Sequence, residues 1–317
     1  THMLGRTAND LFWLSRYVER AENMARLIEA GYRIALQPRV GDDRGSEWIS
    51  TLESAGCTKA YKAKHGEVTT RNVVDFLLFD PTNPSSIHAC LASARRNARA
   101  QRTSLTREMW ESLNGSWLEF QAIRPDTLRS DALPRILDWV KERSAGYRGA
   151  MLNTILRNDT YFFSQLGTFL ERADNTARIL DVKYYVLLPS TNMIGTAVDT
   201  AQWEAILRSV SAHMSYRWVY KESYRSWRIA DYLILNRAMP RSLHACYHKI
   251  GEALGDLAAL YGEEKPCLVT AKSTLAPLER GDIDTIFQSG LHEFLLEFIA
   301  RNSRVAQEIS DAYHFTA

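Results

Sequence analysis

The sequence of 317 residues has little of what marks several common protein classes. Its four cysteines show neither Cys-x-x-Cys spacing nor the density of a small secreted scaffold, which favours a reduced, cytoplasmic protein. No apolar run approaches the ~18 residues that span a bilayer, and no signal-peptide pattern opens the chain, so we expect no membrane partner. Lys and Arg number 39 against 37 Asp and Glu, which gives no general attraction to nucleic acid.

Sequence signatures of cofactor binding are also missing. Neither a GxxxxGK[ST] phosphate loop nor a GxGxxG motif is present, and His292-Glu293 lacks the second histidine of a zinc-protease motif. Helical bundles can build di-iron centres from Glu and Glu-x-x-His, but the sequence contains no Glu-x-x-His. We therefore predict no metal and no cofactor.

What the sequence does contain is helical periodicity along nearly its whole length. Apolar residues recur at steps of three and four in residues 14–28, 126–158 and 283–313, as one buried helical face requires. Pro134 lies early in the second of these segments, where a helix tolerates proline best. Alternating β-type runs are scarce. We predict an all-α helical bundle of roughly ten helices joined by short connections.

One polar stretch occurs twice. RYVERAENMAR at residues 16–26 returns as TFLERADNTAR at 168–178, an offset of 152, and DFLLFDPTNPSSIHAC at 75–90 returns as DYLILNRAMPRSLHAC at 231–246, an offset of 156. So small a change of offset predicts two pseudo-symmetric repeats, approximately 3–155 and 156–317. Because no glycine- or serine-rich linker separates them, we expect them to share one core within a single domain, 3–317.

Side chains retained in both copies are the first candidate site. On a helix Glu19, Glu22, Asn23 and Arg26 fall in one narrow arc opposite the apolar stripe. Exposed ion pairs contribute only a few tenths of a kcal/mol, so the residues that form them should differ between the copies. Neighbouring positions do differ, since Met24 is replaced by Thr176. The retained set therefore indicates either a buried structural ion-pair network or a functional cleft. The set comprises Glu19, Arg20, Glu22, Asn23 and Arg26, and in the second copy Glu171, Arg172, Asp174, Asn175 and Arg178.

The second repeated block adds four candidates. His88 and His244 lie early in helices that we expect Pro84 and Pro240 to open, where the positive end of the helix dipole favours neutral imidazole. Thirteen residues before each histidine an aspartate is expected to begin a short helix; these are Asp75 and Asp231. In the structural interpretation, each aspartate caps a helix or forms an ion pair, and each histidine packs in the core with one hydrogen bond. In the functional interpretation, the four residues serve binding or acid–base chemistry.

A basic run, SARRNARAQR, places Arg95, Arg99 and Arg102 on one helical face. Such a face suits phosphate or carboxylate groups through bidentate contacts. The competing interpretation is a solvated surface or a set of salt bridges between helices. No recognised nucleic-acid module accompanies it, so we predict no nucleic-acid partner.

The sequence resembles a known family at several motifs. Residues 4–36, LGRTANDLFWLSRYVERAENMARLIEAGYRIAL, resemble the opening of the bacterial alpha-E family, a predicted α-helical domain with a duplicated Glu-Arg motif. FLERADNTARILDVKYYVLL at 169–188 is similar to the family's second motif, and residues 80–87 and 97–114 also fit, so the resemblance covers essentially the whole chain. Arg96 departs from it, since the family has Glu before Asn-Ala-Arg, and an acidic role there is in doubt.

This resemblance implies a setting rather than a catalytic role. Such proteins are typically encoded beside circularly permuted ATP-grasp ligases and transglutaminase-like proteases, which implies a part in making or processing a peptide or amide-linked product. The family's motif residues correspond to Glu19, Arg20, Asn23 and Arg26, and to Glu171, Arg172, Asn175 and Arg178.

The leading hypothesis is an accessory subunit that binds the ATP-grasp amide ligase, or its peptide substrate, in a cleft between the two halves. Arginines would hold carboxylate groups there, and glutamates would position an amine or orient the arginines. Two alternatives stay open: a stand-alone enzyme in which the Glu, His and Asp side chains act on a peptide or amide bond, and a purely structural interaction protein.

Overall fold

The computed structural model describes residues 2–36, 45–127, 131–185, 195–221 and 223–315. Within these ranges the chain forms fifteen α-helices and no strand, which confirms the all-α prediction. The expected number of roughly ten helices was wrong, because several connections fold into helices of five to nine residues that are too short to show periodicity. None of the described helices is both long and apolar enough to cross a membrane.

The helices divide at the connection 155–158. Before it lie α1 (Gly5–Ala35), α2 (Ser46–Ser54), α3 (Thr58–Lys64), α4 (Thr70–Val74), α5 (Ile87–Ala100), α6 (Arg107–Gln121) and α7 (Ala132–Thr154). After it lie α8 (Asp159–Tyr185), α9 (Ala197–Ser209), α10 (His213–Tyr220), α11 (Ser226–Ile234), α12 (Leu243–Tyr261), α13 (Pro266–Arg280), α14 (Ile283–Ser289) and α15 (Leu291–Ala312).

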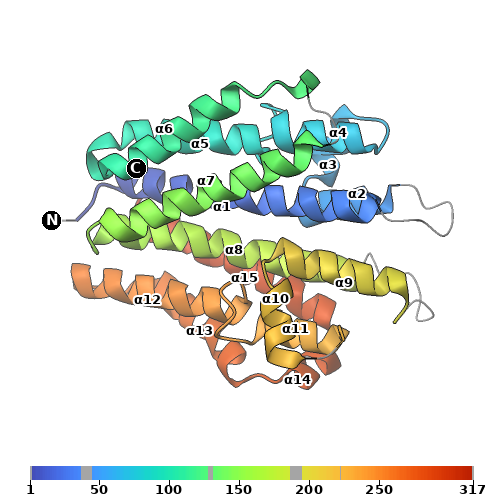
Figure 1. Ribbon diagram of the computed structural model, residues 1–317. Coiled ribbons are helices and arrows are strands. Elements are labelled where there is room, and N and C mark those ends of the chain that lie inside the picture. The colour runs from blue at the N-terminus through green and yellow to red at the C-terminus, as the bar shows by residue number, and fades with distance from the viewer. Residues whose placement is uncertain (1, 37–44, 128–130, 186–194, 222, 316–317) are drawn as a thin grey trace.

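The two long helices α1 and α8 lie side by side through the middle of the molecule (Figure 1). On one side α5 and α7 pack against α1, and α6 packs against both of them. On the other side α12 and α15 pack against α8, and α13 packs against both of these. Each half also sends one helix across the centre, since α2 contacts α8 and α9 contacts α1.

Buried apolar side chains explain this arrangement. The stripe expected on α1, which runs from Leu14 to Ile28, is almost inaccessible to solvent. Residues of α1 enter three separate apolar clusters, one with α8 and the second half, and two with helices of the first half. Because α1 contributes to all three, it organises the packing of both halves.

The last long helix of each half buries a matched set of positions. The set in α7 is Leu133, Leu137, Val140, Ser144, Tyr147 and Met151; the set in α15, each residue 158 positions later, is Leu291, Leu295, Phe298, Asn302, Val305 and Ile309. The two helices therefore present the same pattern of buried positions to α1 and α8.

Several helices begin or end at other residues than the sequence predicted. The periodic segment 283–313 is interrupted at Gly290, whose φ of 95° ends α14 and begins α15. The segment expected over 126–158 is helical only from 132 to 154. Pro84 and Pro240 do not open helices but lie in the preceding turns, and Ser86 and Ser242 are the N-caps of α5 and α12. Of the two aspartates, Asp75 begins a π-helical turn, whereas Asp231 lies inside α11.

At Gly167, helix α8 packs directly against the backbone of α1. A Cβ atom at this position would lie 2.1 Å from the carbonyl oxygen of Phe12 and 3.2 Å from the Cβ of Ser15. The nearest atom belongs to the backbone of α1 and not to a mobile side chain. The two helices can therefore pack this closely only because residue 167 is glycine.

Replacing Gly167 with Ala should therefore destabilise the protein by about 1–3 kcal/mol or more, because the helices must move apart. The matched control is Gly146→Ala in α7, where nothing lies within 4 Å of the added methyl group. That change should leave stability unchanged or raise it by up to about 1 kcal/mol, since alanine favours helix. Urea unfolding of both variants tests the comparison, and equal effects would contradict it.

Candidate functional site

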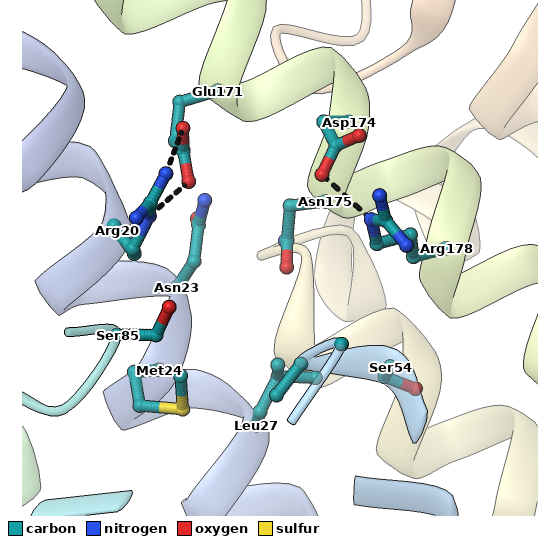
Figure 2. A pocket seen from close by; sticks show the side chains of 12 residues that line it. Arg20, Asn23, Met24, Leu27, Ser54, Ser85, Glu171, Asp174, Asn175 and Arg178 are labelled. Atoms are coloured by element: carbon teal, nitrogen blue, oxygen red, sulfur yellow. Dashed lines mark hydrogen bonds and ion pairs between the residues drawn. The ribbon is translucent and has the colours of Figure 1, made fainter. Parts of the chain in front are cut away.

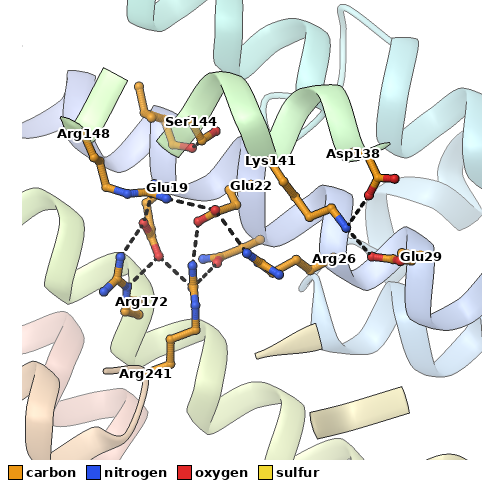
Figure 3. Close-up of polar contacts among 12 residues, drawn as sticks. Glu19, Glu22, Arg26, Glu29, Asp138, Lys141, Ser144, Arg148, Arg172 and Arg241 are labelled. Atoms are coloured by element: carbon orange, nitrogen blue, oxygen red, sulfur yellow. Dashed lines mark hydrogen bonds and ion pairs between the residues drawn. The ribbon is translucent and has the colours of Figure 1, made fainter. Parts of the chain in front are cut away.

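The seam between α1 and α8 is held by reciprocal ion pairs between the two copies of the Glu-Arg motif. Arg20 donates from Nε and Nη2 to the carboxylate of Glu171, at 2.7 and 3.1 Å (Figure 2). Arg172 donates in the same way to Glu19, at 2.8 and 3.2 Å (Figure 3). Each arginine thus binds the glutamate of the other copy, and the bidentate faces of both guanidinium groups are taken by the protein's own carboxylates.

Around Glu19 the seam is closed. Arg241, from the turn before α12, donates to Glu19 at 2.9 Å, to Glu22 at 2.6 Å and to the side-chain oxygen of Asn23 at 3.1 Å. Arg148 of α7 donates to Glu19 at 3.2 Å and to Glu22 at 2.9 Å. Glu19 and Glu22 are 1% and 2% exposed. This half is a buried ion-pair network (Figure 3).

Electrostatics keeps these buried carboxylates charged. Burial alone would raise the pKa of Glu19, but the charges of Arg172, Arg241 and Arg148 outweigh it, and the pKa lies well below its usual range. For Glu22, burial and the neighbouring Glu19 raise the pKa, and Arg241 and its neighbours bring it below the usual value. Both groups are therefore ionised at neutral pH.

Around Glu171 the seam is open. A half-enclosed space of about 220 Å³ lies between α1, α8, the end of α2 and the turn before α5 (Figure 2). We call it the polar hollow. Its walls are Arg20, Asn23, Met24, Leu27, Ser54, Ala55, Gly56, Ser85, Glu171, Asp174, Asn175 and Arg178. The two interpretations of the repeated residues thus divide between the halves: a buried network at Glu19, and a cleft at Glu171.

The acidic wall of the polar hollow is preorganised. Glu171 accepts from Arg20 and, at 2.9 Å, from Arg16; burial raises its pKa, but these two arginines lower it to about 2. Asp174 accepts from Nε of Arg178, four residues later on the same helix, at 2.7 Å. In the first copy Arg26 pairs with Glu22 at the same spacing, but it donates from Nη2, at 3.3 Å.

Asn175 faces the polar hollow from α8. Its side-chain oxygen points into the space between the two long helices (Figure 2). Its amide nitrogen is buried and finds no hydrogen-bond partner in the described part of the chain. A buried polar group without a partner costs free energy, so this side chain is held there at the expense of stability.

The remaining candidates of the second block lie outside the polar hollow. Asp75 is half exposed, with Arg71 at 4.0 Å, and Asp231 accepts a hydrogen bond from the Tyr220 hydroxyl at 3.3 Å. Burial raises the pKa of Asp231.

The two histidines differ. Nδ1 of His244 lies 2.9 Å from the carbonyl oxygen of Leu235, which is the single core hydrogen bond expected of it. The ring of His88 packs edge-on against Trp117, and burial lowers its pKa. Neither these histidines nor Asp75 and Asp231 line the polar hollow.

The basic face of α5 also lies apart from the hollow. Arg95 donates to Asn114 of α6 at 2.9 Å, and Arg95 and Arg102 both lie over the ring of Trp110. Arg99 is exposed. Contacts between α5 and α6 therefore account for Arg95 without a ligand.

Comparison of the two copies missed four residues that complete the site: Arg16, Ser85, Arg148 and Arg241. These four positions differ between the copies, so identity between the copies does not mark them. Arg241 stands where the first copy has Ser85, and Arg16 stands where the second has Thr168. Positions that are charged in only one copy include all three arginines, and Ser85 is the uncharged counterpart of Arg241.

Nothing in the described ranges assembles a metal site, since no three His, Cys, Asp or Glu side chains gather as ligands. All four cysteines are buried thiols, and burial raises the pKa of Cys90 to about 12, which makes it a poor nucleophile.

Comparisons with known proteins agree with the motif. The model of the Alpha-E family, described as a predicted alpha-helical domain with a conserved ER motif, matches residues 3–314. Among curated proteins, the uncharacterized proteins Mb2597 of Mycobacterium bovis and MT2643 and Rv2567 of Mycobacterium tuberculosis are each 23% identical over 96% of this chain. The chain spans 36% of the length of these relatives. No solved structure matches it.

Replacing Glu19 with Gln should destabilise the protein by about 3–5 kcal/mol, because it leaves the guanidinium group of Arg172 buried without a carboxylate and leaves Arg241 with Glu22 alone. The matched control is Glu111→Gln, which breaks an exposed pair with Arg107 and should leave stability nearly unchanged. Urea unfolding measures both. Similar small effects would show that the seam network does not stabilise the fold.

Acid should weaken the seam before it disrupts the helices elsewhere. The pKa of Glu171 falls from its usual 4.5 to about 2 on folding. Its contribution to stability is therefore complete above pH 4.5 and is lost as the pH falls toward about 2. Melting temperatures measured across this interval should drop steeply in the wild type and less steeply in Glu171→Gln. Parallel curves would contradict the assignment.

Proposed function

We propose that this chain, which belongs to the Alpha-E family, is a cytoplasmic binding subunit without catalytic activity of its own, and that the polar hollow holds one charged group of a peptide. The observation that carries the proposal is the difference between the two copies of the motif. The same types of side chain surround a protein arginine at Glu19 and a space of about 220 Å³ at Glu171. In binding sites, a few precisely placed polar or charged groups in a concave space fix the orientation of the ligand and provide specificity.

Binding is favoured over catalysis by the state of the groups in the hollow. Glu171, with a pKa of about 2 and two arginines on its oxygens, is neither a proton donor nor an effective base at neutral pH. Asp231, whose pKa is raised, does not line the hollow. A stand-alone enzyme would need an acid or base in the hollow whose pKa lies near neutrality.

The proposed partner is a circularly permuted ATP-grasp amide ligase, and support for it comes from the family resemblance. An amide ligase must bring a carboxylate and an amine together, so a subunit that holds a charged group of the peptide would orient the reacting end. A transglutaminase-like protease is the second partner that the resemblance suggests. In either case the hollow would supply specificity and the partner would supply the chemistry.

The test uses the purified chain and the purified ligase with a set of candidate peptides. Adding the wild-type chain should raise the rate of amide formation, and Asn175→Leu should lose at least about tenfold of that stimulation, because leucine removes a polar wall of the hollow. The matched control is Asn153→Leu on the exposed end of α7, which should stimulate as the wild type does.

Two outcomes would contradict the proposal. Amide formation or hydrolysis by the chain alone would make it an enzyme. Equal stimulation by Asn175→Leu and the wild type, with both proteins folded by circular dichroism, would show that the hollow plays no part.

A further inference from the structure

The turns that precede α5 and α12 have the same local construction. The Ser86 hydroxyl accepts from the amide of Ala89 at 3.0 Å and donates to the carbonyl of Asp80 at 2.6 Å. The Ser242 hydroxyl makes the two corresponding bonds, to Ala245 at 3.0 Å and to Asn236 at 2.6 Å. The residue just before each cap therefore starts from an equivalent backbone position, and this residue is Ser85 in one turn and Arg241 in the other.

Around Arg241 the chain shows how this kind of site holds a guanidinium group. One nitrogen lies between Glu19 and Asn23, and the other donates to Glu22 (Figure 3). Two carboxylates and one amide oxygen thus surround the planar cation, a geometry that suits arginine better than the point charge of an ammonium.

The corresponding three acceptors border the polar hollow, where serine stands in place of arginine. Glu171, Asp174 and Asn175 occupy the motif positions of Glu19, Glu22 and Asn23, and all three line the space beside Ser85. The serine side chain is too short to reach them as an arginine would. The hollow is therefore found where Arg241 has no counterpart.

The charges leave room for one more cation. Four arginines accompany the two carboxylates of the closed site: Arg26, Arg148, Arg172 and Arg241. Three accompany those of the open site: Arg16, Arg20 and Arg178. A guanidinium group bound in the hollow would give the open site four guanidinium groups, the number that the closed site has.

From this correspondence we infer that the polar hollow binds a guanidinium group, carried by an arginine side chain of a peptide or by a small alkylguanidine. The inference rests on the proposed function and names its ligand class. A volume of about 220 Å³ admits such a group with several waters, since one water occupies about 30 Å³. An anion would meet Glu171 and Asp174, whose arginines are already paired with them.

The experiment titrates the full chain calorimetrically with ethylguanidinium and with N-ethylurea, which has a similar shape but no charge. Ethylguanidinium should bind at least about tenfold more tightly, because its hydrogen bonds to the carboxylates are charge-assisted. Propionate is the anionic probe and should not bind. A peptide containing arginine, compared with the same peptide containing citrulline, shows whether the surrounding chain adds affinity and so distinguishes a peptide ligand from a free guanidine.

Ser85→Arg should supply the missing group from within the chain and abolish binding of ethylguanidinium. Asn153→Arg, on the exposed end of α7, adds the same charge outside the hollow and should bind as the wild type does. Ser85→Met provides a long side chain without charge. The melting temperature of Ser85→Arg should exceed that of Ser85→Met, because only the arginine can pair with the acidic wall.

The outcomes separate the inference from the proposed function. Binding of propionate or N-ethylurea that Ser85→Arg and Ser85→Met both block would keep the hollow as a binding site and overturn its cationic ligand. Failure of every probe, together with a Ser85→Arg variant no more stable than Ser85→Met, would overturn both. Ethylguanidinium binding that Ser85→Arg leaves intact would place the cation elsewhere and overturn the inference.

Discussion

The exchange of arginines between two buried glutamates is the interaction on which the structure depends. Arg20 binds Glu171 and Arg172 binds Glu19, so neither copy of the motif can satisfy its own buried charge. Removing one partner of a buried pair leaves an uncompensated charge, which costs far more than the pair contributes. The two copies are therefore tied to each other, and the rest of the bundle packs around that tie, with α5 to α7 on one side and α12, α13 and α15 on the other (Figure 1).

The two halves differ in the arginines that surround their buried glutamates. Arg241 and Arg148 close the seam at Glu19, and neither has an equivalent at Glu171, where Ser85 leaves a space. Under the proposed function, the open copy is the one available to a ligand, whereas the corresponding space in the closed copy is filled by Arg241.

The sequence predicted the helical class and the motif residues of the seam, because each leaves a periodic or duplicated pattern. It did not predict Arg241 or Ser85 as site residues, since their importance lies in the difference between the copies. The short helices α3 and α4 and the interruption at Gly290 were missed for another reason. A segment of one or two turns shows too little periodicity, and a single glycine in a helical pattern does not reveal its φ angle.

A rigid ion-pair network and a binding site support each other in this fold. Ordering side chains around a charged guest costs conformational entropy, which weakens binding when the walls are mobile. In the polar hollow these side chains lose their conformational entropy during folding, before any ligand binds. Glu171 is fixed by Arg16 and Arg20, and Asp174 is fixed by Arg178. The contacts that lock α1 against α8 thus also hold the walls in place. Under the proposed function, the retained Glu-Arg motif follows from stability in one half and from recognition in the other.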